Sequence, residues 1–546
     1  MSSNMTTRQR PRVAVVGSGL AGLTTAYLLT REGADVWLID KAPRLGFHAW
    51  SVELEPANAL ALDLAEKRPA AGDTPAVDVP MRSFQGGYYP LLIALYRHLG
   101  LPLSPAAFTF SFASLPTGRP LDENDTYFIH SGASGVSLPS LPTQAWRSPG
   151  AFARAVLALL GVGLCYIVLL VIAFASWHGL VSAVTFGQLV DAVAARLERP
   201  LPLVRTPLGR VFKSFAADIV LPLFSAVGTM TADDVWSTRA DVLLDYIHAG
   251  VGTSHYSIGG AMSARDVARL LAEPVRAQGA DHVRLGTGID GITYADDGLT
   301  LSLGDDEITV DRVVVATQAS AARALLATLE PSLPKPEARR VARMRSALAD
   351  VHYRDTIVVT HRDRAVLPIP EDVRDINLVQ PATPDVPGDA TPELASGASS
   401  APSSPCPTPR GITPFFAPEQ GYTMATHLVA PPGVEPVLQT TNPAVPIGGE
   451  LLGVARLERA LPLADDDTLN GLHPRRGPGE GRARVFLAGS YAYPGIPLLE
   501  GCVGSARRVV EDMLGREVRC IDWDAGRGSF AGRAWRWRRS PRAGGY

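Results

Sequence analysis

The feature that most constrains the fold lies near the N-terminus, where residues 17–22 read Gly-Ser-Gly-Leu-Ala-Gly. The run Arg12–Val16 before it is short and rich in β-branched residues, which predicts a strand leading into a glycine turn. Apolar residues then recur at helical spacing as far as Arg31, and Ala34–Ile39 predicts a second strand that ends at Asp40. Strand, glycine turn, helix and strand in this order form a β-α-β unit, so the chain is predicted to begin with a Rossmann-type unit of an α/β fold.

The spacing of these glycines is typical of a dinucleotide-binding turn. Gly17 permits the sharp turn, Gly19 lets the backbone approach a pyrophosphate, and Gly22 lets the helix pack closely on the strand. Glycine turns also occur in unrelated loops, but here the flanking strands and helix make an incidental turn the lesser alternative. Asp40 can accept hydrogen bonds from ribose hydroxyls and would repel a 2′-phosphate, which favours FAD or NAD over NADP. The predicted binding residues of this unit are Gly17, Ser18, Gly19, Ala21, Gly22 and Asp40.

Composition excludes several other classes of protein. The chain has 546 residues, enough for two or three domains, and a formal net charge of -3, which gives no field to recruit nucleic acid. None of its four cysteines forms a Cys-x-x-Cys pair, so neither a metal site nor a disulfide framework is predicted. This cysteine usage favours a reducing compartment on at least the catalytic side, and the polar N-terminus shows no secretory signal.

One long apolar segment suggests contact with a membrane. Ala155–Trp177 carries no charged residue and would form a helix about 34 Å long, enough to cross a bilayer core. Arg147 and Arg154 precede it and His178 follows it, as interfacial anchors would. The alternative is a buried helix of a large cap domain.

A single transmembrane span would conflict with a shared cofactor site. It would place the N-terminal unit and the C-terminal end of the chain on opposite sides of the bilayer. A helix within one leaflet, or a hairpin whose return arm is Gly179–Val190, remains possible. We therefore predict a membrane-associated protein whose catalytic domain is cytoplasmic.

Two further segments resemble known flavoproteins. Asp40–Gly46 resembles the acidic-x-x-x-Arg-x-Gly-Gly segment of the flavin amine oxidases and phytoene desaturases, although Phe47 replaces the second glycine. Val485–Ser490 with Tyr493–Gly501 resembles their C-terminal FAD segment, in which a helix N-terminus points at the flavin and stabilises its anionic reduced form. The resemblance implies FAD as the cofactor. It adds the following residues to the predicted cofactor site: Lys41, Arg44, Gly46, Ile289, Gly489, Ser490, Pro497 and Leu498.

A closer similarity is to predicted NAD/FAD-binding proteins encoded beside cyclopropane fatty acid synthases. It covers most of the chain outside residues 150–180 and the Pro/Ser-rich insertion. The segments that carry it are Asp78–Met81, Tyr88–Pro90, Leu99–Gly100, Leu221–Ala226, Tyr353, His361–Asp363 and Tyr422–Met424. Pro497–Glu500 replaces the His-Glu-Asp of that group, so no role of its histidine is carried over.

These patterns predict a discontinuous FAD-binding domain and a second domain. Val283–Ile289, Leu299–Leu303 and Val313–Ala316 are strand-like and are expected in one layer, and Val485–Ala488 with Leu498–Leu514 predicts a closing strand and helix. The predicted organisation is a Rossmann-type FAD-binding domain from 11–90, 250–325 and 480–518, an α+β substrate or cap domain from 91–249 and 326–479 that includes the apolar helix 155–177, a disordered insertion at 381–409, and a basic tail at 519–546. The tail could lie on anionic lipid or fray in solvent.

The chemistry predicted from this organisation is hydride transfer from a small or lipidic substrate to flavin N5, in amine oxidation or desaturation. Weak catalytic candidates are His255, Tyr256, His361 and Tyr493, with His248, His427 and Tyr491 as further lining candidates; each could equally be structural. Neither Lys213 nor Lys335 has the context of the lysine that amine oxidases place near N5. The alternatives are a non-catalytic, membrane-associated FAD-binding scaffold and an enzyme that uses NAD without flavin.

Overall fold

A computed structural model describes most of the chain. The described residues are 10–46, 50–53, 76–80, 83–106, 108–115, 121, 125–130, 137–198, 207–259, 262–295, 298–381, 421–430, 435–474 and 483–526. Phe47, nearly all of the predicted insertion at 381–409 and most of the tail at 519–546 lie outside these residues.

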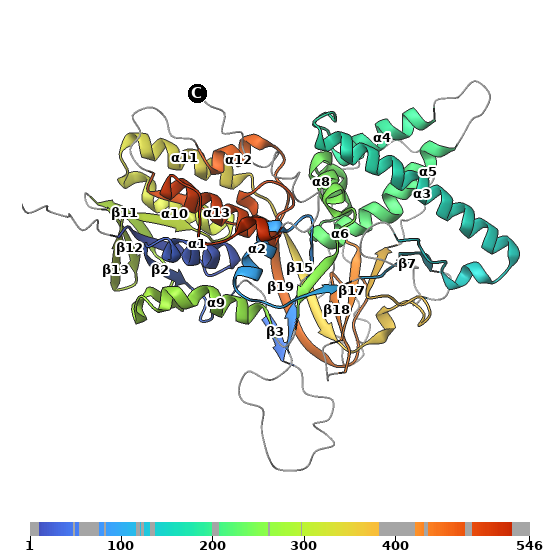
Figure 1. Cartoon of the computed structure of the whole chain (residues 1–546), viewed down its shortest axis with the longest axis horizontal. Helices are drawn as coiled ribbons and strands as arrows, with labels where there is room; N and C mark the ends of the chain where they lie inside the picture. The colour runs from blue at the N-terminus through green and yellow to red at the C-terminus, as the bar shows by residue number, and fades with distance from the viewer. Residues whose placement is uncertain are drawn as a thin grey trace, which may run out of the picture.

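A five-stranded parallel sheet forms one half of the molecule (Figure 1). Its order is β10-β2-β1-β14-β20, so strands far apart in the chain become neighbours. The strands are β1 (Arg12–Val16), β2 (Asp35–Asp40), β10 (Val283–Leu285), β14 (Arg312–Val315) and β20 (Val485–Leu487). The predicted strand–helix–strand unit is confirmed, with α1 spanning Leu20–Arg31 between β1 and β2.

Both faces of this sheet are covered, because side chains alternate along each strand. Val13 and Val15 pack toward one face, against α1, α9 (Ala264–Arg276) and α13 (Leu499–Leu514). Ala14 and Val16 pack toward the other, in one cluster with α10 (Ala319–Leu329), α11 (Lys335–Ala349) and the antiparallel strands of residues 291–310. The result is a three-layer Rossmann-type arrangement.

One expectation about this sheet is wrong. The run Leu299–Leu303 was expected in the same layer, but it lies in β12 (Gly298–Leu303) of a separate three-stranded antiparallel sheet with β11 (Gly291–Ala295) and β13 (Asp306–Val310). A tight turn at Gly304, with φ of +68°, returns the chain directly into β13. Antiparallel strands can be joined by such a short turn, whereas parallel strands need a long crossover.

The second half contains a seven-stranded mixed sheet and a group of helices (Figure 1). The sheet order is β19-β15-β18-β17-β16-β7-β8. Its strands are β7 (Phe110–Leu115), β8 (Thr126–His130), β15 (Tyr353–His361), β16 (Ile376–Pro381), β17 (Met424–Val429), β18 (Val437–Thr441) and β19 (Leu451–Ala460). The helices are α3 (Pro149–Trp177), α4 (Phe186–Leu197), α5 (Leu208–Phe215), α6 (Leu221–Gly228), α7 (Ala232–Ser237) and α8 (Ala240–Gly250).

Smaller elements join the two halves. β5 (Phe84–Gln85), β9 (His255–Ile258) and β6 (Leu103–Ala106) form a short sheet, and β3 (Trp50–Glu53) pairs with β4 (Ala76–Val79). α2 (Pro90–His98) packs on α13, and α12 (Asp466–Leu472) packs on α11.

The apolar segment forms α3, at the outer side of the second half (Figure 1). Ser148 begins the helix by accepting a hydrogen bond from the Ala151 amide at 3.1 Å. The buried residues of α3, Cys165, Leu169, Ala173 and Ser176, lie on one face. By length and composition, α3 and the apolar stretch Leu208–Gly228 could each cross a membrane.

The predicted hairpin return arm at Gly179–Val190 does not form. Gly179, with φ of +76°, ends α3, and the chain stays non-helical until Thr185. Thr185 and Gln188 then form a capping box that starts the separate helix α4 at Phe186. Because β1 and β20 flank β14 in one sheet, a span at 155–177 cannot put the two chain ends on opposite sides of a bilayer.

Candidate functional site

Two glycines of the N-terminal turn are required by close packing. Gly17 has φ of +106°, and a Cβ there would lie 2.7 Å from the Ala316 carbonyl oxygen. A Cβ on Gly22 would lie 1.8 Å from the Gly17 carbonyl oxygen, so only glycine allows α1 to approach the strand. These two residues therefore shape the turn.

Gly19 is different, because a Cβ there would meet no heavy atom of the described residues within 4 Å. Gly19, Leu20 and Ala21 line a cavity at the N-terminus of α1, where the amides of the first turn have no partner within the helix. An empty space beside a glycine and free amides fits a pyrophosphate.

Asp40 ends β2 beside this turn and lines the same cavity. Its Oδ2 accepts hydrogen bonds from the Ser18 amide at 2.5 Å and the Ser18 hydroxyl at 2.6 Å, and its Oδ1 accepts one from the Ala42 amide at 2.8 Å. Ser18 is fully buried and lies behind the cavity wall. The serine therefore orients the carboxylate, a role that the glycine pattern did not reveal.

The structure brings most of the predicted cofactor residues together around one cavity. Besides Gly17, Gly19, Ala21 and Asp40, its wall includes Lys41, Arg44, Gly46, Ile289, Gly489, Ser490, Pro497 and Leu498. Gly22 and Ser18 lie behind that wall, where they shape the turn and hold Asp40. Segments from both ends of the chain and from its middle thus meet at the carboxyl ends of the parallel strands, where α/β sheets bind ligands.

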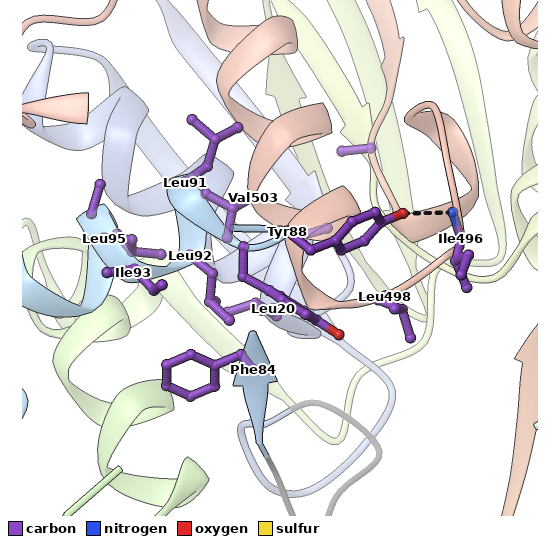
Figure 2. Packing of buried hydrophobic residues seen from close by; sticks show 14 of the residues in the cluster. Leu20, Phe84, Tyr88, Leu91, Leu92, Ile93, Leu95, Ile496, Leu498 and Val503 are labelled. Atoms are coloured by element: carbon purple, nitrogen blue, oxygen red, sulfur yellow. Dashed lines mark hydrogen bonds between the residues drawn. The ribbon is translucent and has the colours of Figure 1, made fainter. Parts of the chain in front are cut away.

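The segments that lead into α2 and α13 are linked to each other (Figure 2). The Ile496 amide donates a hydrogen bond to the Tyr88 hydroxyl at 2.9 Å. The buried Glu500 carboxylate accepts from the amides of Leu91 and Leu92, at 3.1 and 3.0 Å, and so caps α2. Glu500 is thus a structural residue, while its neighbour Leu498 faces the cavity.

Of the four catalytic candidates, His255 lines the cavity. Tyr256, His361 and Tyr493 lie outside the wall that the described residues form. Tyr256 stacks on Phe84 with ring centroids 6.5 Å apart, and Tyr493 packs so closely on α13 that a Cβ at Gly504 would lie 2.4 Å from its ring.

His361 has a structural role inside the seven-stranded sheet. The ring is completely buried, its Nε2 lies 2.8 Å from the Thr440 hydroxyl, and its Nδ1 accepts a hydrogen bond from the Asp363 amide at 3.1 Å. Burial lowers the pKa of His361 to about 4, so the imidazole is neutral at physiological pH. His361 therefore serves the packing and hydrogen bonding of the sheet.

The further candidates also separate into lining and packing residues. His427 lines the cavity, and its Nδ1 has no hydrogen-bond partner among the described residues. Burial lowers the pKa of His427 to about 4. Tyr491 lines the cavity and donates a hydrogen bond to the Thr317 carbonyl at 3.1 Å. His248 instead stacks on Trp177, with ring centroids 4.8 Å apart.

One buried tyrosine and one partly buried tyrosine stand where the two halves of the molecule meet at the cavity. Tyr89 and Tyr246 both contribute to its wall, together with Arg459 from β19. Burial raises the pKa of both hydroxyls well above the ordinary value for tyrosine, so both remain neutral hydrogen-bonding groups. No local sequence pattern distinguishes a cavity tyrosine from a core tyrosine, so these two residues could not be predicted.

Beyond these tyrosines the cavity becomes apolar. Its total volume is about 2260 Å³, whereas a pocket for one small ligand typically holds roughly 300–1,000 Å³. We call the part formed by the seven-stranded sheet, α3 and α6 the apolar arm. Its wall includes Phe110, Phe112, Phe128, Ile376 and Leu378 from the sheet, Leu159, Val162, Gly163 and Leu164 from α3, and Leu223, Ala226 and Val227 from α6.

Strand pairing explains why the apolar arm could not be read from the sequence. Phe110 pairs with His130 on β8 and with Ile376 on β16, and Ile376 pairs with His427 on β17. All four residues line the cavity, although 317 positions separate Phe110 from His427 in the chain.

Comparison with known families supports the N-terminal unit. Residues 15–99 match the model of the NAD(P)-binding Rossmann-like domain. No curated protein matches the chain.

Solved structures of similar fold cover nearly the whole chain. An oxidoreductase from Methanosarcina mazei aligns with a TM-score of 0.51 and 12% identity, over 92% of this chain and 100% of its own. Cyclohexylamine oxidase from Brevibacterium oxydans aligns with a TM-score of 0.46 and 14% identity, over 93% of this chain and 100% of its own. A putrescine oxidase bound to putrescine aligns with a TM-score of 0.45 and 14% identity, over 93% of this chain and 99% of its own. Residues 15–99 thus resemble an NAD(P)-binding Rossmann-like domain, and the chain has the same overall fold as the Methanosarcina oxidoreductase.

Proposed function

We propose that the protein is an FAD-dependent oxidoreductase that removes a hydride from a small or lipidic substrate. The observation that carries this proposal is the continuity of one cavity. It runs from Gly19 and Asp40, which suit a dinucleotide, past Tyr89 and Tyr246 to the apolar arm. A cofactor and an apolar substrate could therefore meet in one volume.

The residues present fit an FAD. Free amides at the start of α1 and the space beside Gly19 suit the pyrophosphate, and Asp40 suits the ribose. Gly489, Ser490 and the N-terminus of α13 would hold the flavin end. FAD supplies a hydride acceptor at N5 when bound, and the protein positions the substrate and excludes water.

The choice between amine oxidation and desaturation depends on the polar groups of the wall. Lys213 pairs with Asp191 at 2.7 Å on the surface, and Lys335 begins α11. Among the described residues, Lys41 is the one lysine of the wall, and it lies at the dinucleotide end. His255 and His427 remain as groups that could orient a substrate, and this wall favours an apolar substrate over a small cationic amine.

The proposal includes association with a membrane, with the FAD-binding half in the cytoplasm. It is supported by α3, whose outward side chains are apolar and exposed. Substrates partitioned into a bilayer would then be close to the apolar arm.

The second candidate is a non-catalytic, membrane-associated FAD-binding scaffold. Glu500, in the segment that replaces the His-Glu-Asp of the similar proteins, is engaged in capping α2. The Asp40 carboxylate already accepts three hydrogen bonds from the protein. Both observations are compatible with a site that binds a cofactor without turnover.

Cofactor analysis and anaerobic reduction separate these possibilities. Purified protein is expected to be yellow and to release FAD on denaturation; release of NAD alone would identify the nicotinamide alternative. The flavin absorbance is then followed without oxygen during titration with long-chain alkenes, long-chain amines and short polar amines. Bleaching by a long-chain compound supports the proposal. A flavin that none of these compounds reduces supports the scaffold, and bleaching by short polar amines alone excludes the lipidic substrate.

A further inference from the structure

The apolar arm is a second binding region, beyond the dinucleotide end. Its floor is the face of β7, β8 and β16 that presents Phe112, Phe128 and Leu378. Its walls are Leu159 and Val162 of α3 and Ala226 of α6, which pack around these side chains. Such a lining offers a ligand dispersion contacts and removal from water, which suits a hydrocarbon chain.

The outer face of α3 carries a continuous apolar stripe. Leu157, Leu160, Leu164, Ile167, Val171 and Phe174 follow one another at intervals of three and four residues, and each is between 45% and 71% exposed. Water-soluble proteins rarely expose an apolar patch of this extent, so a partner or a membrane is expected to cover it.

The stripe and the apolar arm meet. Leu160, Leu164 and Ile167 belong to the exposed stripe and also line the cavity. Leu138 is 88% exposed and lines the cavity too. Side chains that are shared by the outer surface and the wall mark the rim of an opening, so the apolar arm opens onto the stripe.

Two partners could cover the stripe, a bilayer or a second copy of α3. The spacing of three and four residues also suits a helix–helix seam, but such seams are normally flanked by charged residues that specify the pairing. Residues 155–177 contain none. A second helix would also cover the opening, whereas lipid chains would be continuous with it.

We propose that the apolar arm binds one long hydrocarbon chain, of the acyl or isoprenoid class, which enters sideways from a bilayer across the exposed stripe of α3. This inference rests on the proposed function for its purpose, because the chain would bring a substrate to the flavin end. The binding step itself needs no cofactor.

The first test uses the wild-type protein and the fluorescent fatty acid cis-parinaric acid. Displacement by alcohols of 8, 10, 12, 14 and 16 carbons should show affinity rising about fourfold per methylene until the arm is full. An affinity that does not depend on chain length overturns the proposal.

Two variants separate chain binding from membrane binding. Gly163 is exposed and lines the cavity, and a Cβ there would meet no heavy atom of the described residues within 4 Å, so Gly163→Trp can narrow the opening of the arm without displacing α3. It should weaken hexadecanol binding at least tenfold and leave flotation with phosphatidylcholine vesicles unchanged. Leu157 and Val171 lie on the stripe beyond the cavity wall. The double variant Leu157→Glu, Val171→Glu should lose flotation and keep the equilibrium affinity for hexadecanol.

The opposite results overturn the inference. Unchanged hexadecanol binding in Gly163→Trp removes the chain site, and unchanged flotation in the double variant removes the membrane face. If the wild-type protein does not float with vesicles and sediments as a dimer, the stripe is the contact surface for a second copy of the chain. If either variant fails to fold, the chain-length series and flotation of the wild-type protein still decide. Flavin content is measured in the same preparations. A colourless protein that binds hexadecanol refutes the proposed function alone. A yellow protein that fails to bind hexadecanol refutes this inference alone.

Discussion

Replacement of Asp40 tests the dinucleotide end most directly. An ionised carboxylate offers about four positions for hydrogen-bond donors. Three are taken by the Ser18 amide, the Ser18 hydroxyl and the Ala42 amide. One position therefore remains for a ribose hydroxyl, unless the Ser18 hydroxyl rotates away.

The magnitude follows from this count. A hydrogen bond to a charged group contributes about 1.5–3 kcal/mol, and each 1.4 kcal/mol is a factor of ten in affinity. Asp40→Ala should therefore raise the Kd for FAD by roughly 10- to 150-fold. The buried Ser18 amide also loses its acceptor, at a cost of about 1–3 kcal/mol in stability. That cost falls on the free and the bound protein alike, so it does not change the affinity.

The assay is titration of the flavin-free protein with FAD, followed by quenching of flavin fluorescence. Asp35→Ala is the matched control, because Asp35 begins the same strand and lies outside the described wall of the cavity. The control should bind FAD as the wild type does. Equal Kd values for Asp40→Ala and wild type would refute the assignment of Asp40 to the ribose.

Other predictions address the turn, the helix contact and pH. Gly22→Val should abolish folding of the N-terminal unit, since its Cβ would lie 1.8 Å from a carbonyl oxygen. Gly19→Ala should keep the circular dichroism spectrum of the wild type and lose affinity for FAD. Equal behaviour of the two variants would contradict the roles assigned to these glycines. Glu500→Ala should lower the free energy of unfolding by about 3 kcal/mol, through two charge-assisted hydrogen bonds to the start of α2, and an unchanged urea midpoint would disprove this cap. The pKa of His361 is about 4 in the folded protein, below its value near 6.5 in the unfolded chain, so the unfolded state binds more protons between these two pH values. The free energy of unfolding should therefore fall as the pH drops from about 6.5 to 4, by at most ~1.4 kcal/mol per pH unit for this group. His361→Gln should show a weaker decline in urea midpoint between pH 7 and pH 4.5, and an identical decline would exclude His361 as its source.

The dinucleotide end could be predicted from the sequence because its determinants are local. Gly17, Gly19, Gly22 and Asp40 lie within one β-α-β unit, whose backbone geometry admits few other residues. Of the four catalytic candidates only His255 lines the described wall of the cavity, since a histidine or tyrosine carries no local sign of its surroundings. His361 and His427 both lie on strands of the same sheet, yet one faces a buried hydroxyl and the other the cavity.

By itself, the sequence determined the N-terminal strand–helix–strand unit, the closing strand and helix, and the existence of a long uncharged helix, because each follows from short-range periodicity and glycine placement. Only the tertiary structure decided that the apolar stripe of α3 and the floor of the apolar arm meet at one opening. That floor arises where β7 pairs with β16 and β8, and such long-range pairing leaves no periodic trace in either segment. The proposed dinucleotide site thus rests on local features of the chain, and the proposed hydrocarbon site rests on the assembled sheet.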